Sequence, residues 1–585
     1  MFPNGSKVES ASILMNCPAG VDNTKYCVKI SQEVFIHSNV SLDKTRIVSM
    51  EMTNLAPIIG VIVASVLYAA INIEDLKVYT KLRTFAESKN LSRIIVLAIL
   101  ILSAPIIVSL ILLALLYKVV CFWIIREVDK NFVSFLDGID VFWSLEDEAT
   151  KNVINVLGVI ETISSETLVE RIKQKLTAIV DNKCYSKMFY RRQEKFGWYY
   201  WRKYTDINLD EYVKILNIKN KNVELNNQDL EDVMSELSYH PLPFHDKGMF
   251  QILVTKQTIG NNATGRSDYG IIFRIDHALG DGVALIKVLC QTLSDQTEND
   301  PDNLLFMPSN YIATKENPST NLLNTLKQLC TMIICFVDGI LRKSDNHSLH
   351  GPSLLGKKLF KWTDPEENLF QMIRDIKQHE KDMHFSDILV TSLSGGLRKY
   401  FAKTMDHIPE DVAIILPVRL PNLPKLAAKN EFKLDNNFTV SVLDLPTKGK
   451  RPIKEIKRRC NLVRKSVEPL VKHYFLKVGY LFPKQILQPL LKNSQATLIF
   501  SNMPGPDSVS ICGGNLIKSL VFFIPNKGTT GLGVTALYYG GVLRFSAMAD
   551  ARLVPTSEDL SLILDAMVDE IKQMHAAYMN QSQLI

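Results

Sequence analysis

Two long uncharged stretches dominate the hydrophobic pattern of the first part of the chain. Met52–Ile73 reads MTNLAPIIGVIVASVLYAAINI, and Ile94–Tyr117 reads IIVLAILILSAPIIVSLILLALLY. At about 1.5 Å per residue, either stretch is long enough to cross roughly 30 Å of hydrocarbon. The first stretch follows a largely polar segment, 1–51, and so does not resemble a cleaved signal peptide. The pattern predicts two transmembrane anchor helices within 52–125, and buried core helices are the alternative.

The charges around these stretches leave the direction of crossing open. The loop between them is basic, and the positive-inside rule places such a loop in the cytosol; its basic residues are Lys77, Lys81, Arg83, Lys89 and Arg93. The segment that follows the second stretch is also basic and favours the opposite orientation, through Lys118, Arg126 and Lys130.

From about residue 126 the pattern changes to β-rich runs that alternate with helical periods. MFQILVT and GIIFRIDHAL have the composition of buried strands, whereas ETLVERIKQKLTAIV has apolar residues at helical spacing. The polar, Pro- and Asn-rich stretch Ser294–Ser319 interrupts this pattern and indicates a crossover or linker. Strand patterns then resume at AIILPV, FTVSVLDL, ATLIFSN, LGVTALYY and VLRFSAMAD, and an amphipathic helix, Ser557–Met574, follows. We expect a mixed α/β fold with one lobe at 126–293, a linker at 294–350 and a second lobe at 351–585.

Charge and cysteine usage narrow the partners of this fold. The 67 basic and 61 acidic residues leave a net charge of +6, a mild excess that is compatible with an anionic lipid surface or an anionic cofactor and does not indicate nucleic acid. The nine cysteines are scattered without a CxxC pair, so we expect mostly reduced thiols and no metal site. The basic stretch Lys448–Arg459 is interpreted as a solvated helix face, with contact to lipid headgroups or a cofactor phosphate as the alternative.

The stretch FRIDHALGDGVAL, Phe273–Leu285, combines a strand, a histidine and a turn into an apolar helix. Strand alternation places His277 at the end of an apolar row, and places Asp276 on the opposite face beside Arg274, with which it is expected to pair. Asp281 precedes Gly282 and the helix, where its carboxylate can cap the first amides. His277 is therefore a candidate general base beside a helix N-terminus, and an ordinary strand-end histidine is the alternative.

Several stretches in a fixed order resemble the wax ester synthase/diacylglycerol acyltransferase family, whose active-site motif is HHxxxDG followed by an apolar helix. In the first half they are FLDGIDVFWSLEDEATKNVINVLGVIE, ELSYHPLPFHDKGMFQILV and the strand of His277. In the second half they are HSLHGPSLLGKKLFKW, HFSDILVTSLSGGLRKYF, LPVRLP, DNNFTVSVLDLP, ATLIFSNMPGP and GLGVTALYYGGVLRFSAMAD. The resemblance extends from about Phe135 to the C-terminus.

This resemblance implies a pair of chloramphenicol-acetyltransferase-like lobes, with an acyl-CoA tunnel and an acceptor channel that meet at the motif histidine. The implied reaction transfers a fatty acyl group from acyl-CoA, as cosubstrate and without a permanently bound cofactor, to a long-chain alcohol or to diacylglycerol. His277 matches the family's general base, and Asp281 and Gly282 match its structural Asp-Gly. The family's Asn-Pro-Gly turn falls on Asn502, Pro504 and Gly505, which are expected to shape the channel or to form a plain turn.

The chain departs from the family at Asp276, which stands where the motif has its first histidine. Two alternatives therefore stay open: a non-catalytic lipid-binding or scaffold protein of the same fold, and an acyltransferase for another alcohol such as a sterol. Since acyl-CoA is cytosolic and both acceptors partition into lipid, we expect a bilayer-attached protein with a cytosolic catalytic domain. The endoplasmic reticulum is the expected membrane and the plasma membrane is the alternative. The sequence identifies no protein partner.

Overall fold

The computed structural model describes most of the chain after residue 88. The described residues are 89–218, 224–240, 242, 248–261, 265–295, 342–380, 383–418, 434–449, 453–466, 468–492 and 495–582. All of them belong to one compact unit, Ile62–Ile585. The polar segment 1–51, the first predicted anchor and most of the linker 294–350 lie outside the described residues.

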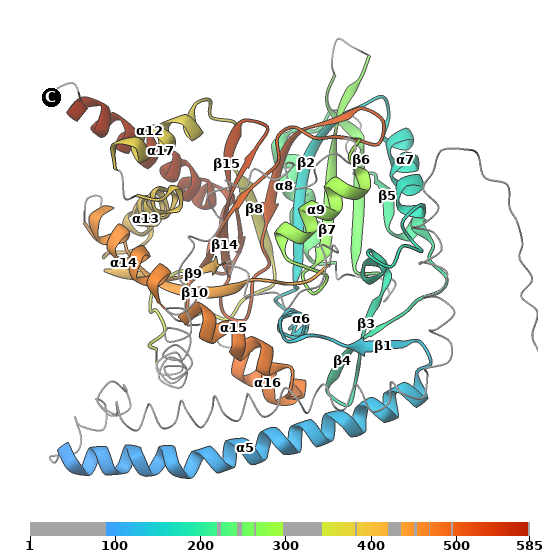
Figure 1. Cartoon of the computed structure of the whole chain (residues 1–585). Coiled ribbons are helices and arrows are strands. Elements are labelled where there is room, and N and C mark those ends of the chain that lie inside the picture. Colours follow the sequence, from blue (N-terminus) through green and yellow to red (C-terminus); the bar gives the residue numbers. More distant parts are fainter. Residues whose placement is uncertain are drawn as a thin grey trace, which may run out of the picture. The chain divides into compact units, whose positions relative to one another are not determined.

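The first of two six-stranded sheets has the order β12-β13-β2-β7-β6-β5 (Figure 1). Its strands are β2 (Val153–Thr162), β5 (Val213–Leu216), β6 (Phe250–Asn261), β7 (Ser267–Asp276), β12 (Ser510–Ile511) and β13 (Asn515–Phe523). Alternate residues of β7 enter different cores: Ile271 and Phe273 pack with α7 (Ser165–Thr177) and α9 (Gly282–Leu293), whereas Ile272 packs with α8 (Asn227–Ser238). The sheet is therefore covered on both faces, which explains why its strands lack a polar side.

The second sheet has the order β10-β9-β11-β14-β15-β8. Its strands are β8 (Lys358–Trp362), β9 (Asp411–Val418), β10 (Thr439–Pro446), β11 (Leu498–Pro504), β14 (Leu532–Tyr539) and β15 (Val542–Asp550). It shares a second core with α12 (Leu369–His379), α13 (Phe385–Thr404) and α17 (Ser557–Ser582), which Figure 1 shows on one side of it. Because β12 and β13 pair into the first sheet, the second half of the sequence supplies strands to both sheets.

A small three-stranded sheet has the order β1-β4-β3. Its strands are β1 (Phe132–Phe135), β3 (Arg191–Lys195) and β4 (Trp198–Arg202). The long helix α5 (Lys89–Val128) packs on it through Cys121 and Ile125. The other described helices are α6 (Gly138–Ser144), η2 (Ser186–Phe189), η3 (Leu209–Glu211), α14 (Ile453–Lys465), α15 (Glu468–Gly479) and α16 (Lys484–Lys492).

The predicted mixed α/β class is confirmed, but the two predicted transmembrane helices are not. Within the described residues one helical stretch, Pro105–Val128, is long and apolar enough to cross a membrane by length and composition. The first apolar stretch, Met52–Ile73, falls outside the description.

The basic stretch 448–459 overlaps α14, whose arginines make ion pairs. Arg458 and Arg459 both contact Glu455, and Arg459 also contacts Asp411. These pairs are consistent with the interpretation as a solvated helix face.

Candidate functional site

His277 lies in the turn between β7 and α9, directly beside the last residue of the strand. Its amide donates to the carbonyl oxygen of Asn152 at 2.8 Å, which continues the pairing of β7 with β2. Asp276 closes the turn, because its carboxylate accepts the Ala278 amide at 2.9 Å and its carbonyl accepts the Leu279 amide at 3.0 Å. The backbone around His277 is thus fixed on both sides of the residue.

The imidazole of His277 is stacked on the indole of Trp143 from α6. The ring centroids are 3.8 Å apart and the planes differ by 7°, while the ring of Phe438 lies 5.6 Å away at a tilt. Only 7% of the His277 surface is exposed. Its Nδ1 atom is buried and has no hydrogen-bond partner among the described residues. Aromatic packing therefore holds the ring on the side of Trp143, and Nδ1 is left without a partner among the described residues.

Burial lowers the pKa of His277 to about 4, and the nearby charge of Lys527 acts in the same direction. The sequence predicted a histidine near its ordinary pKa of about 6.5. The lower pKa arises because the imidazolium form would lose its hydration between two aromatic rings. His277 is therefore neutral near pH 7.

A segment from the second half of the sequence completes the surroundings of His277. The side-chain amide of Asn436 donates to the His277 carbonyl at 2.8 Å and to the Asp140 carboxylate at 2.9 Å. Lys187 donates to Asp140 at 2.8 Å and to the carbonyl of Leu434 at 3.2 Å. The segment 434–438 is thereby bound to α6 and to the histidine turn.

The sequence predicted that Asp276 pairs with Arg274, but the structure does not contain this pair. The Asp276 carboxylate lies 2.9 Å from the guanidinium of Arg192 on β3, which also approaches Glu146 at 3.5 Å. Arg274 instead donates to the carbonyls of Leu237 and His240. The prediction was wrong because the carbonyls at the C-terminal end of α8 accept hydrogen bonds from Arg274, whereas the Asp276 carboxylate lies beside Arg192 where the strand turns. Burial raises the pKa of Asp276 to about 6 although Arg192 opposes the shift.

Asp281 is the N-cap of α9 and also holds the second half of the sequence. One carboxylate oxygen accepts the Ala284 amide at 2.9 Å, and the other accepts the Asn437 amide at 3.0 Å. The Asp281 amide donates to the Asp435 carbonyl at 3.3 Å. Asp281 therefore stabilises the helix terminus and the segment that carries Asn436 at the same time.

Gly282, the first residue of α9, lies close to the end of β11, which carries the Asn-Pro-Gly residues. A Cβ atom at Gly282 would lie 2.4 Å from the sulfur of Met503, between Asn502 and Pro504 at the end of β11. Asn502 is exposed, and Gly505 donates its amide to the Tyr538 carbonyl at 2.9 Å. A Cβ atom at Gly505 would lie 2.3 Å from that carbonyl oxygen. Close approach to the backbone therefore requires glycine at 505, whereas at 282 the flexible Met503 side chain would have to move.

Lys527, which the sequence analysis did not single out, is buried beneath Trp143. Its ammonium donates to the carbonyls of Phe142, at 2.7 Å, and of Leu145, and it lies 5.7 Å from the centre of the Trp143 ring. Burial lowers its pKa to about 7. No pattern in the sequence indicated that Lys527 would bind the backbone around Trp143 or that Asn436 would bind the His277 carbonyl, because these partners are distant in the sequence. Trp143 lies in a stretch that resembles the family, but no pattern indicated that it would stack on His277.

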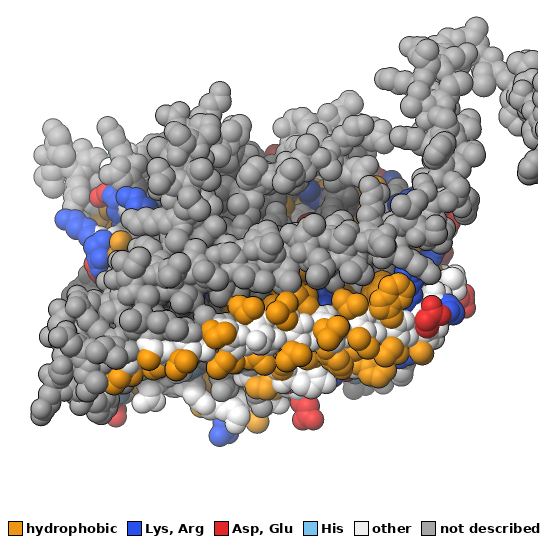
Figure 2. Space-filling view, turned by 60° about the horizontal axis from the view of Figure 1, so that its bottom comes forward, with side chains coloured by type: hydrophobic (Ala, Val, Ile, Leu, Met, Phe, Trp, Pro, Cys, Tyr) orange, Lys and Arg blue, Asp and Glu red, His pale blue; other side chains and the backbone are white. Residues whose placement is uncertain are grey.

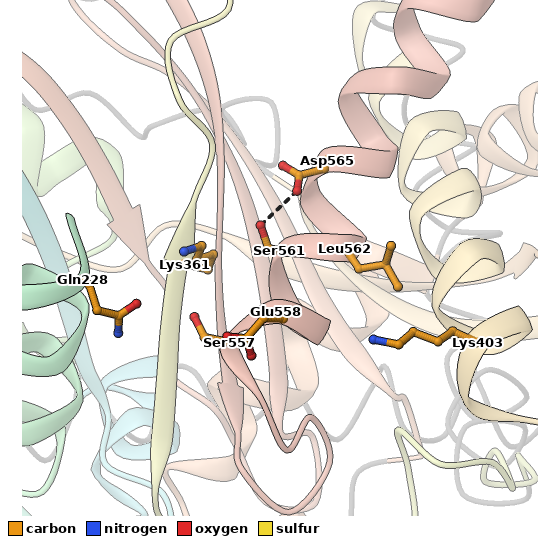
Figure 3. Close-up of a pocket in the computed structure, with 8 residues that line it drawn as sticks. All are labelled: Gln228, Lys361, Lys403, Ser557, Glu558, Ser561, Leu562 and Asp565. Atoms are coloured by element: carbon orange, nitrogen blue, oxygen red, sulfur yellow. Dashed lines mark hydrogen bonds between the residues drawn. The ribbon is translucent and has the colours of Figure 1, made fainter.

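A surface pocket of about 500 Å³ lies apart from these residues (Figure 3). It is lined by Gln228, Lys361, Lys403, Ser557, Glu558, Ser561, Leu562 and Asp565. Its lysines are already paired, Lys361 with Glu231 and Lys403 with Asp559, each at 2.7 Å. The pocket shares no residue with the surroundings of His277, and within the described part of the chain no group of His, Cys, Asp or Glu is placed to hold a metal.

Comparisons with known proteins agree with this architecture. Residues 434–575 match the family model described as the WS/DGAT C-terminal domain. The structure is similar to a wax ester synthase/diacylglycerol acyltransferase from Marinobacter aquaeolei VT8, with a TM-score of 0.51 and 14% identity over 76% of this chain and 100% of that chain. The match and this likeness of fold confirm the resemblance to the wax ester synthase/diacylglycerol acyltransferase family.

Two further findings complete the comparison. A trichothecene 15-O-acetyltransferase from Fusarium sporotrichioides matches with a TM-score of 0.49 and 10% identity over 75% of this chain and 94% of that chain, a likeness too weak to carry an inference. No curated protein sequence matches the chain.

The buried ion pair at Asp276 generates a prediction on stability. Arg192→Met should lower the free energy of unfolding by about 3 to 5 kcal/mol, because it leaves the buried Asp276 carboxylate without its cation. Arg192→Met combined with Asp276→Asn should lose less than the sum of the two single variants. Thermal unfolding of all four proteins measures the coupling, and strict additivity would show that the pair does not act as a unit.

The cap at Asp281 generates a second prediction. Asp281→Ala should lower the free energy of unfolding by about 1 to 2 kcal/mol, because the Ala284 and Asn437 amides both lose their acceptor. Asp281→Asn keeps one acceptor oxygen and should lose less. Chemical denaturation of the three proteins provides the comparison, and an unchanged Asp281→Ala protein would contradict the bridging role.

Proposed function

We propose that this chain is an acyl-CoA-dependent O-acyltransferase that uses His277 as its general base. The fatty acyl group would pass to a long-chain alcohol, which makes a wax ester, or to diacylglycerol, which makes triacylglycerol. The observation that carries the proposal is a buried, neutral histidine whose ring is held by Trp143 and whose Nδ1 has no partner among the described residues. It lies where segments from both halves of the sequence meet, in a chain with a WS/DGAT C-terminal domain.

The chemistry needs no covalent acyl-enzyme. The neutral imidazole accepts the hydroxyl proton while the hydroxyl oxygen attacks the thioester carbonyl. Collapse of the tetrahedral intermediate breaks the carbon–sulfur bond, and the imidazolium returns the proton to the coenzyme A thiolate. A low pKa makes His277 a weak base but a strong acid for this second transfer, so both steps use one group.

Stabilisation of the intermediate is expected from the N-terminal end of α9. The amide of Asp281 is already bonded to Asp435 and that of Ala284 to the Asp281 carboxylate, which leaves the amides of Gly282 and Val283 as candidates. Their dipoles favour a developing negative charge next to His277. Asp281 contributes by fixing this end of the helix rather than by touching the substrate.

Two functional alternatives remain beside the proposed reaction, and a measurement of which hydroxyl compound, if any, accepts the acyl group distinguishes them. A non-catalytic lipid-binding protein is motivated by Asp276 at the position of the family's first histidine, but the Arg192 pair provides that carboxylate with its own structural role. An acyltransferase for a sterol or another alcohol keeps the same base. Apolar pockets discriminate by only about 1 to 3 kcal/mol per methylene, so the acceptor has to be measured.

The membrane remains part of the proposal because the two substrates meet there. Acyl-CoA is cytosolic, whereas the proposed acceptors partition into the bilayer. We therefore assign the domain from residue 126 onward to the cytosolic face of the endoplasmic reticulum, with the plasma membrane as the alternative. In sealed microsomes a tag after Ile585 should be digested by protease without detergent, and its protection would contradict this placement.

Removal of the base provides the main test. His277→Ala should lower turnover at least about a hundredfold, because general base catalysis typically contributes 10²- to 10⁴-fold. The assay is transfer from radiolabelled acyl-CoA to hexadecanol or to diacylglycerol by purified protein in detergent. His407→Ala, at an exposed histidine, is the matched control. Activity of His277→Ala near that of the unmodified protein, with either acceptor, would reject the mechanism.

The pH dependence tests the environment of the same residue. Protonation removes the base, so a pKa of about 4 predicts that the acid-side loss due to His277 begins only below about pH 5. On the acid side, Asp276, with a pKa of about 6, is also expected to titrate above that range, whereas Lys527, with a pKa of about 7, loses its charge as the pH rises and affects the alkaline side. Asp276→Asn removes its contribution and isolates that of His277. A loss of activity centred near pH 6.5 in both proteins would show that His277 is hydrated.

A further inference from the structure

The C-terminal half of helix α5 has a stripe of buried residues, which cannot be recognised in the sequence because the residues around it are also apolar. From Ile111 onward its buried residues are spaced three and four apart and lie on one face: Ile111, Ala114, Lys118, Cys121 and Ile125. Cys121 and Ile125 pack against Trp198 and Tyr200 of β4. The stripe covers about 21 Å of helix at 1.5 Å per residue, so the C-terminal half of α5 lies along the folded body.

The charge within this stripe points toward protein. Lys118 is 2% exposed, and its ammonium lies 3.9 Å from the ring centre of Tyr480 and 5.6 Å from that of Trp198. The neighbouring Tyr117 hydroxyl donates to the carbonyl of Phe196 at 3.0 Å. These contacts use aromatic faces to hold a cation, which a helix surrounded by lipid would not offer.

The surface of α5 outside this stripe is apolar and exposed. Figure 2 shows a band of hydrophobic side chains along the helix. Its large exposed members are Ile99, Leu102, Ile106, Ile107, Leu110, Leu112, Leu113, Leu116, Tyr117, Val120, Trp123, Ile124 and Val128. Such a contiguous apolar surface marks an interaction site rather than a solvated helix face. The sequence from Ile94 to Tyr117 contains no charge that could pair with a protein partner, which favours lipid as the occupant.

A perpendicular crossing of the bilayer conflicts with the way α5 is bound to the body. If Pro105–Val128 spanned the membrane, the small sheet that packs on its last turns would be drawn to the depth of the hydrocarbon. The Arg202–Asp129 ion pair lies on that sheet, and the Lys130–Glu127 pair beside it is largely exposed. Such groups are costly in hydrocarbon.

We propose that α5 lies along the membrane surface, with its buried stripe against the body and its exposed aliphatic face in the outer part of one leaflet. The exposed Arg126 at its C-terminal end then lies at the level of the lipid headgroups. The partner is a lipid bilayer, and this arrangement replaces the crossing expected from the sequence of Ile94–Tyr117. The inference rests on the membrane attachment proposed above but not on the acyl transfer.

The depth of three positions on the exposed face provides the test. A fluorescent amino acid is introduced by stop-codon suppression at Ile106, Leu113 or Val120 in the full chain. Each labelled protein is then reconstituted in vesicles of phosphatidylcholine with a minority of phosphatidylserine. The acyl chains carry bromine either near the headgroup or near the terminal methyl. Because the three positions are seven residues apart, they share one face and are separated by about 10 Å along the axis. The same label at Lys399, an exposed polar position, is the control.

We expect all three labels to be quenched more strongly by bromine near the headgroup than by bromine near the terminal methyl. The ratio of quenching by these two lipids should be the same at the three positions. The label at Lys399 should be quenched by neither lipid. A ratio that changes progressively from Ile106 to Val120 would show a crossing helix and would overturn the proposal. Absence of quenching at all three positions would overturn it as well, because the face would then be covered by protein. Loss of acyl transfer in His277→Ala tests the reaction separately, so the two failures are distinguishable.

Discussion

The stacking of His277 on Trp143 is the contact on which the rest of the candidate site depends. It removes the imidazole from water, which lowers the pKa of His277 and keeps the ring neutral. The indole is itself placed by Lys527, whose ammonium binds the carbonyls on either side of Trp143. Because Lys527 comes from the connection between β13 and β14, the position of the base depends on both halves of the sequence.

Three polar residues also join the first half of the sequence to the second half around His277. Asn436 joins the His277 carbonyl to Asp140, Asp281 joins α9 to the Asn437 amide, and Lys187 joins Asp140 to Leu434. Each bond satisfies a buried or helix-terminal group that would otherwise be costly. The segment 434–438 is therefore bound at several points to the turn that carries the base.

Local patterns in the sequence predicted the strand of His277 and the cap at Asp281, since alternation and capping depend on neighbouring residues. They could not predict the partner of Asp276, because Arg192 is 84 positions away in the sequence and on another sheet. Asn436 and Lys527 were missed for the same reason. The uncharged stretch of α5 predicts a crossing from composition alone, and composition does not show that Lys118, just beyond the stretch, is buried against the body.

Chemical rescue measures the central claim most directly. His277→Gly should leave a space beside Trp143 that an added imidazole can occupy by the same stacking. The account predicts that His277→Gly is inactive in acyl transfer and that imidazole restores part of the turnover, with no effect on the unmodified protein. Turnover of His277→Gly without imidazole at the level of the unmodified protein would contradict the assignment of His277 as the base.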